Sequence, residues 1–127
     1  MTATPKATLK ALEQRDGHLC AWTGTDLGRL VPQHRQGGMG GRKSKHRLSN
    51  VIWLDSLLNG LIESDPVLQG EARRRGIKIS LHADPKRVPV EHAVHGWVLL
   101  GDAGEVSALT VSEAHEIMHD LGIGAAA

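Results

Sequence analysis

Residues 30–35 read LVPQHR, residues 37–41 read GGMGG, and residues 48–64 read LSNVIWLDSLLNGLIES. The apolar run Leu48–Leu54 is typical of a short strand, and the glycine-rich segment must be a loop because so much glycine cannot hold a helix or strand. Residues 18–30 are short and punctuated by glycine, which predicts a strand-turn-strand element. Asp55 can cap a helix whose apolar stripe is formed by Leu57, Leu58, Leu61 and Ile62. The centre of the chain is therefore expected to run from strand through loop and strand to helix.

The flanking segments add helices and strands, which predicts an α+β domain. Capping and stop signals predict helices from Thr4-Pro5 to Asp16-Gly17, from Asp65-Pro66 to Gly76, and from the Thr110-x-x-Glu113 capping box to Gly122. Strands are expected at Ile77–Leu81 and Trp97–Leu100, the latter closed by a turn over residues 101–104. The last helix should turn Val111, Ala114, Met118 and Leu121 inward.

Composition indicates an ordinary soluble protein. The chain has 127 residues, of which 40% are hydrophobic and 23% charged, and this suits one compact domain. No apolar run is long enough for a membrane span, and the polar N-terminus does not resemble a signal peptide. The single cysteine, Cys20, excludes an internal disulfide and a four-cysteine zinc knuckle, so a reducing cytoplasm is the default expectation.

The charge is unevenly distributed. From Leu27 to Leu54 there is no Asp or Glu, and six Lys and Arg residues give this segment a charge of +6. Because the whole chain carries +1, the remainder carries −5. A basic segment on an acidic body is expected of a local polyanion site, although a solvated basic loop has the same composition.

Four polar residues in the central segment have the chemistry that phosphodiester hydrolysis needs. Such a reaction requires a base to activate water and a cation to stabilise the phosphate charge. His34 at a strand end can be the base, and Asn50, 16 residues later, can hold the intervening loop through backbone hydrogen bonds. Asn59 and Glu63 are four residues apart, so on a helix both side chains could reach one ion. Their oxygen atoms suit Mg²⁺ or Mn²⁺ better than Zn²⁺.

These residues resemble the HNH, or ββα-metal, endonuclease family. The segments His34-Arg35-x-GGMGG, SNVI and GLIES are similar to a cysteine-poor H-N-N variant found among actinobacterial phages. The resemblance runs from about Arg15 to Gly104. It implies one HNH-like domain over residues 1–127, with a motif core at about 18–65, a C-terminal extension at about 77–123 and a short C-terminal strand pair. It assigns His34 as general base, Asn50 as the structural Asn, and Asn59 and Gln33 as metal ligands.

The chain departs from the family at two sets of positions. Cys20 matches the first of four zinc cysteines, but Thr23, Asp55 and Leu58 occupy the other three, so no structural zinc is expected. Instead, Cys20, Trp22 and Leu58 should fill that space with apolar contacts. Gln33 stands where the family usually has Asp or His, which leaves Glu63 as the one charged candidate ligand. Affinity for Mg²⁺ or Mn²⁺ should therefore be poor unless substrate phosphate completes the site.

The resemblance leaves two functions open. One is a DNA endonuclease or nickase in a bacterial host cytoplasm, and the other is a protein of the same fold that has lost catalysis and binds DNA or a host protein. In either case, five basic residues near the site are expected to contact phosphates with little sequence preference: Arg35, Arg42, Lys43, Lys45 and Arg47.

A second motif suggests a different function. Residues 115–119 read HEIMH, a literal H-E-x-x-H that on a helix could place His115 and His119 on one zinc ion with Glu116 as base. The extended motif fails because Ala125 stands where a third histidine would be needed. A zinc peptidase is therefore the minor alternative. The histidines at 82, 92 and 95 lack ligand spacing and are interpreted as structural or exposed.

Overall fold

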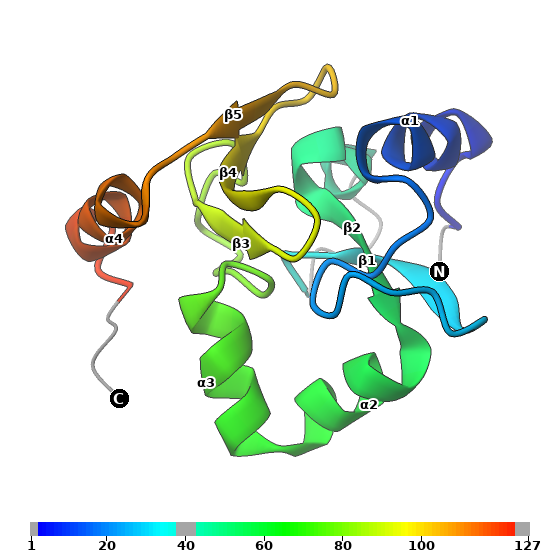
Figure 1. Cartoon of the computed structure of the whole chain (residues 1–127), viewed down its shortest axis with the longest axis horizontal. Helices are drawn as coiled ribbons and strands as arrows, with labels where there is room; N and C mark the ends of the chain where they lie inside the picture. Colours follow the sequence, from blue (N-terminus) through cyan, green and yellow to red (C-terminus); the bar gives the residue numbers. More distant parts are fainter. Residues whose placement is uncertain (1–2, 38–42, 124–127) are drawn as a thin grey trace.

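The structure, a computed structural model, describes residues 3–37 and 43–123 and confirms the α+β class (Figure 1). Its described part contains four α-helices and two small antiparallel sheets. Helices α1 and α4 lie at opposite edges of the view in Figure 1, with the two sheets between them. The elements are α1 (Lys6–Asp16), β1 (Leu30–His34), β2 (Val51–Asp55), α2 (Ser56–Ser64), α3 (Pro66–Arg74), β3 (Val90–His92), β4 (Gly96–Leu100), β5 (Val106–Ala108) and α4 (Val111–Asp120).

Strands β1 and β2 form an antiparallel pair that α2 follows directly. The register runs from Leu30 opposite Asp55 to His34 opposite Val51. The second strand was expected to begin at Leu48, but Leu48–Asn50 form a short 3₁₀ helix, η2, and the strand begins at Val51. The chain turns into α2 at Asp55, whose carboxylate accepts the N–H groups of Leu57 at 2.9 Å and Leu58 at 3.2 Å.

The alternation of β2 divides the apolar core into two clusters. Ile52 and Leu54 pack in one cluster with Ile62 of α2, while Val51 and Trp53 pack in the other with Leu12 of α1. Successive side chains of a strand point to opposite faces, so one fully buried strand supplies both clusters. The hairpin is thus held between α1 on one side and α2 on the other.

The segment before β1 differs from the expected strand-turn-strand element. Residues 18–29 form turns and bends, and the strand begins at Leu30. The turn closes on itself through the bond from the Gly24 N–H to the Cys20 carbonyl at 2.7 Å, and it also joins both sheets. The Ala21 N–H donates to Trp53 and the Ala21 carbonyl accepts from Ala93, each at 2.8 Å. Local turn chemistry therefore prevails over the weak strand pattern.

The apolar contacts expected in place of the zinc cysteines are confirmed. Cys20 is fully buried, and Trp22 and Leu58 pack against the same cluster. The guanidinium of Arg75 lies 4.5 Å from the centre of the Trp22 ring and covers its face. This corner of the fold is filled by side chains.

Helix α3 begins as predicted, because Asp65 accepts the N–H of Val67 at 2.9 Å and Pro66 occupies the first turn. After it, Gly76 adopts a positive φ of 69°, and a Cβ at this position would collide with the Pro89 carbonyl oxygen. The strand expected at residues 77–81 is wrong: one bridge, between Gln36 and Ile79, joins this segment to its neighbour.

The C-terminal part forms a three-stranded sheet, ordered β3-β4-β5, rather than the expected strand pair. Helix α4 begins with the predicted capping box between Thr110 and Glu113. Ala114 and Met118 are buried as expected, but Val111 and Leu121, 57% and 47% exposed, are not. None of the helices in the described ranges has the length and apolar character needed to cross a membrane.

Candidate active site

The hairpin places His34 beside the residue that was expected to organise the loop. His34 ends β1 and is half-buried. The next residue donates its backbone N–H to the Asn50 carbonyl at 2.7 Å. Residues separated by the whole glycine-rich loop therefore meet at one end of the sheet.

Asn50 fastens both ends of that loop. Its Oδ1 accepts the Gln36 N–H at 3.0 Å, and its Nδ2 donates to the Lys45 carbonyl at 2.9 Å. The side chain is fully buried, so each bond replaces one that water would otherwise provide. Asn50 thus fixes the chain on both sides of the residues outside the described part.

His46 is a partner of His34 that sequence reasoning missed. It lies in η1 (Lys43–His46), and its Nδ1 is 3.2 Å from Nε2 of His34, with the ring centres 5.1 Å apart. The Nε2 of His46 is buried and has no hydrogen-bond partner in the described segments. The sequence offered only an indirect indication of this contact. Because Asn50 binds the backbone of Lys45, it also brings His46, the next residue, back to the end of the strand.

Both histidines are held in the neutral form. Burial lowers the pKa of His34 most, the neighbouring His46 lowers it further because the two rings disfavour being charged together, and the charges of Lys45 and Lys78 act in the same direction. Burial and the neighbouring Lys45 also lower the pKa of His46. Since a neutral imidazole has one ring nitrogen with a lone pair, His34 can accept a proton at neutral pH.

Lys78 is the other residue that sequence reasoning missed. Its neighbour Ile79 donates its N–H to the Arg35 carbonyl at 3.0 Å, which brings residues 78–79 alongside the end of β1. Burial lowers the pKa of the Lys78 ammonium, and the opposing effect of Glu63 is smaller. The charge of Lys78 therefore acts on His34, and that of Glu63 acts on Lys78.

The candidate metal ligands are distributed over β1 and α2. Gln33 pairs with Ile52, whose side chain packs toward Ile62 of α2, so Gln33 lies on the face of the hairpin that α2 covers. On α2, Asn59 is half-buried and its Oδ1 has no hydrogen-bond partner among the residues described, whereas Glu63 is exposed. Within those residues, no hydrogen bond joins His34 directly to Asn59 or Glu63. We call His34, His46, Asn50 and Lys78 the His34 cluster, and Asn59 is the candidate ligand on the helix that follows the hairpin.

Two of the five basic residues expected to contact phosphate are engaged by the protein instead. Arg35 is fully buried and donates to the carbonyls of Gly76, Ser49, Pro85 and Val88 at 2.8–2.9 Å. Burial lowers the pKa of Arg35 to about 9, which leaves it charged at neutral pH. Arg35 therefore joins the hairpin to residues 76–88, and its expected contact with phosphate is wrong. Arg47 is paired with Asp84 and Asp102 at 3.3 and 2.9 Å.

The other three basic residues fall into two groups. Lys45 is only 6% exposed and directs its charge toward the two histidines. Arg42 lies outside the described residues, as does the side chain of Lys43. Of the five basic residues expected to contact phosphate, the described part of the structure therefore leaves Lys45 as the one whose charge acts on His34.

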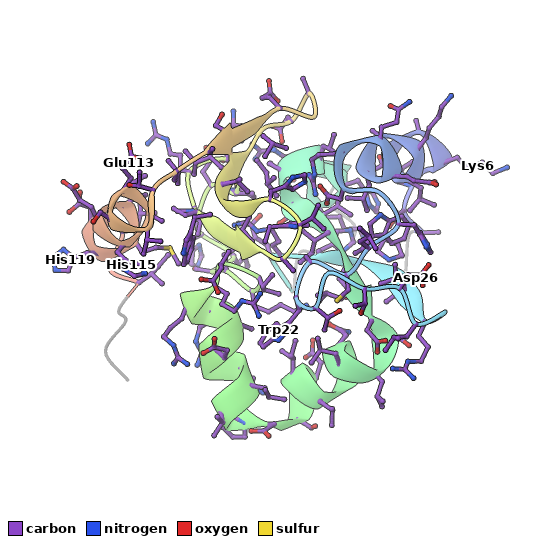
Figure 2. The ribbon with its side chains drawn as sticks, in the orientation of Figure 1. Lys6, Trp22, Asp26, Glu113, His115 and His119 are labelled. Carbon is purple, nitrogen blue, oxygen red and sulfur yellow. The ribbon has the colours of Figure 1, made fainter. Side chains whose placement is uncertain are left out.

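The H-E-x-x-H motif on α4 does not assemble a metal site within the described ranges. The side chain of His119 is 90% exposed, and Figure 2 shows it at the outer edge of α4, pointing away from the domain. His115 is also exposed and contacts the edge of Trp97. No described His, Cys, Asp or Glu gives these two histidines a third ligand.

A different trio has the spacing of metal ligands. One ligand atom from each of Asp16, His92 and His95 lies within 4.8 Å of the others. Asp16 accepts from His92 Nε2 at 3.2 Å and His95 Nε2 at 2.8 Å, and Arg15 donates to both carboxylate oxygens at 2.7 Å. Arg15 also donates to the backbone carbonyls of Leu48 and Val51. We call Arg15, Asp16, His92 and His95 the Asp16 network.

Hydrogen bonding in the Asp16 network argues against metal binding. The Val94 N–H donates to Nδ1 of His92, so the neutral ring carries its proton on Nε2 and has no lone pair there for an ion. Burial alone would raise the pKa of Asp16, but bonds from Arg15 and His92 hold it well below its usual range. Burial also lowers the pKa of His92. The network is a buried ion pair that joins α1 to both sheets.

Comparison of the chain with protein-family models, with curated proteins and with solved structures found no significant match. Its function is therefore argued from the site alone.

Proposed function

We propose that this protein hydrolyses phosphodiester bonds in DNA as an HNH-type endonuclease or nickase, with His34 as general base. The observation that carries the proposal is the coincidence of three features around one hairpin. A neutral histidine ends β1, a buried asparagine fastens the following loop, and the next helix holds an amide oxygen without a partner. If the protein is phage-encoded, we place this activity in the bacterial cytoplasm.

His34 can take the proton of the attacking water. When Nε2–H of His34 donates to His46, the lone pair on Nδ1 remains available, and no described residue occupies that atom. Water gives this proton to Nδ1 while its oxygen bonds to phosphorus, and the bond from phosphorus to the leaving oxygen breaks. The products are a phosphate monoester and a hydroxyl end, and the proton passes from His34 to solvent or to the leaving oxygen.

The implied cation fits the donor atoms in part. Asn59 offers a buried, unpartnered oxygen, and Gln33 and Glu63 could supply further oxygen ligands, a set that suits Mg²⁺ or Mn²⁺. When bound, such an ion would stabilise the charge that develops on the phosphate. Lys78, whose charge acts on His34, adds a positive charge from the protein itself.

An inactive DNA- or host-protein-binding role is the second candidate, and one observation favours it. Of the three candidate ligands only Glu63 is charged, and it is exposed and close to the ammonium of Lys78. A lysine there competes with a divalent ion for the same carboxylate. In this alternative the His34 cluster would bind phosphate without cleaving it.

Nicking of supercoiled plasmid in Mn²⁺ or Mg²⁺ separates these possibilities. For the enzyme, we expect His34→Ala to lose at least about a hundredfold in rate, as expected on removal of a general base. His119→Ala, an exposed histidine on α4, is the matched control and should cleave like the wild type. Gln33→Asp adds a carboxylate and should raise the rate at limiting Mn²⁺. Absence of wild-type cleavage, with salt-sensitive DNA binding retained, would favour the inactive protein.

A further inference from the structure

A cavity of about 670 Å³ lies between the end of α3, residues 78–88 and the end of α4. Its volume is in the range of sites that hold a small molecule. Four basic side chains line it, those of Arg73, Lys78, His82 and Arg87, together with apolar groups that include Ile79 and Val88. The one acidic residue in the lining, Asp84, is paired with Arg47 at 3.3 Å.

The two arginines that line this cavity, Arg73 and Arg87, differ from the other arginines that the structure describes in how their charges are paired. Elsewhere each guanidinium has a protein partner: Arg15, Arg29, Arg47, Arg74 and Arg75 pair with carboxylates, and Arg35 with backbone carbonyls. Within residues 3–37 and 43–123, Arg73 and Arg87 have no acidic partner, and the Lys78 ammonium makes no hydrogen bond or ion pair. Two guanidinium groups in the lining are therefore without an acidic partner among the described residues, and the Lys78 ammonium beside them is influenced by Glu63 without forming an ion pair with it.

We propose that this cavity binds the phosphoryl group of a nucleotide, either free or within a nucleic-acid strand. Two guanidinium groups match the geometry of phosphate oxygens, and an ammonium adds a point charge beside them. The apolar wall at Ile79 and Val88 can receive a sugar or base. A simple carboxylate or inorganic anion would leave most of the volume unfilled.

The site stands on these charges and does not require the proposed hydrolysis. It is nevertheless connected to the His34 cluster, because Lys78 lines the cavity and its charge acts on His34. A phosphate bound beside Lys78 would offset that charge. The pKa of His34 should therefore rise when the cavity is occupied.

Binding is measured in EDTA, where metal-dependent cleavage is suppressed. The probes are a fluorescein-labelled single-stranded DNA decamer, followed by anisotropy, and adenosine monophosphate, followed by calorimetry. The test variant is Arg73→Ala/Arg87→Ala, in which both residues are exposed and the fold should be kept. The control, Lys6→Ala/Lys10→Ala, removes two exposed charges from α1, at the other edge of the molecule (Figure 2).

We expect the cavity variant to weaken binding of at least one probe by about tenfold or more, and the control by less than about threefold. If the decamer binds and the mononucleotide does not, the ligand is a strand, and the salt slope of the cavity variant should fall by about two. If the mononucleotide binds, the cavity is a nucleotide site. The proposal is overturned if neither probe binds the wild type at low salt, or if both double variants behave alike.

Discussion

The Asp16 network and the His34 cluster both bring histidines together with polar partners, but they differ in how completely those partners satisfy one another. In the network, both oxygens of Asp16 and both nitrogens of His92 are engaged, and the side chain of Asp16 is fully buried. In the cluster, His46 Nε2 is buried and has no partner among the described residues, and the same is true of Asn59 Oδ1 on the helix that follows the hairpin. Satisfied buried groups hold a fold, whereas a buried polar group without a protein partner needs one from outside the protein, such as a water, an ion or a ligand. The site with metal-like spacing is thus the structural one.

The largest effect is expected when the closed network is broken. Asp16→Ala leaves the buried guanidinium of Arg15 without its counter-ion, which should lower the free energy of unfolding by about 3–5 kcal/mol. Urea denaturation followed by circular dichroism measures this change. Asp26→Ala, which removes an exposed carboxylate paired with His18, is the matched control and should change stability little.

The same network gives a test with metal ions. Because His92 Nε2 holds a proton, neither stoichiometric Zn²⁺ nor EDTA should shift the Tm of the wild type. A rise in Tm with zinc that disappears in His95→Ala would show that the network binds metal, and the comparison with the His34 cluster would then be wrong.

The next largest effect is expected at Asn50. Asn50→Ala removes at least the two side-chain hydrogen bonds seen within the described residues, from a buried position, with an expected loss of about 2 kcal/mol in the free energy of unfolding. Hydrogen exchange gives the sharper measurement, since the Gln36 amide should lose its protection. The control is Gln69→Ala, which removes an exposed hydrogen bond from the side-chain amide of Gln69 to the Glu63 carbonyl. Equal effects of the two variants would mean that Asn50 does not fasten the loop.

A smaller effect concerns the protonation of His34. His46→Gln removes a titrating neighbour that, after burial, is the strongest influence lowering the pKa of His34. The pKa of His34 should therefore move up toward its ordinary value of 6.5, and the acid limb of the nicking rate should move to higher pH. Titration of the imidazole protons by NMR measures the shift in both proteins. An unchanged or lower pKa in the variant would contradict the proximity of the two rings.

The sign of the accompanying stability change follows from linkage. A histidine whose pKa is lower in the folded chain favours folding fully above its unfolded pKa of about 6.5. As pH falls below 6.5, the unfolded chain takes up the proton first, and the free energy of unfolding decreases. His34, His46 and His92 all contribute in this direction, so His46→Gln should flatten the decline. The contribution of Asp16 is instead lost only at far lower pH, because its pKa is held below the ordinary 3.8.

The local parts of the fold could be predicted from the sequence because their causes are local. Asp55, Asp65 and Thr110 each cap a helix within three residues, and the sequence contains both the cap and the helix. The strands predicted at 18–30 and 77–81 failed because their pairing depended on distant segments. A turn that bonds to itself needs no partner strand, and one bridge does not make a strand.

The surroundings of the candidate site could be predicted only in part, because the composition gives the number of charged residues but not which groups pair with them. The acids that pair with Arg47 lie 37 and 55 residues away, and the carbonyls that surround Arg35 lie up to 53 residues away. Neither set can be inferred from the basic run itself. Lys78 was missed for the same reason, because its approach to His34 depends on how α3 returns to the hairpin. A single sequence therefore predicts His34 as a candidate base but not the electrostatic surroundings of this residue.

The smallest effect on stability, and the sharpest separation of folding from function, is expected at Asn59. Because its Oδ1 bonds to nothing in the described structure, Asn59→Ala should change the free energy of unfolding by less than about 1 kcal/mol. The same variant should need a higher Mn²⁺ concentration for nicking, by about tenfold or more, whereas Asn59→Asp should need less. Thermal melts and Mn²⁺ titrations of the nicking rate measure the two quantities. A stability loss as large as that of Asn50→Ala would mean that Asn59 has a structural partner, and the contrast between the helix after the hairpin and the Asp16 network would then be wrong.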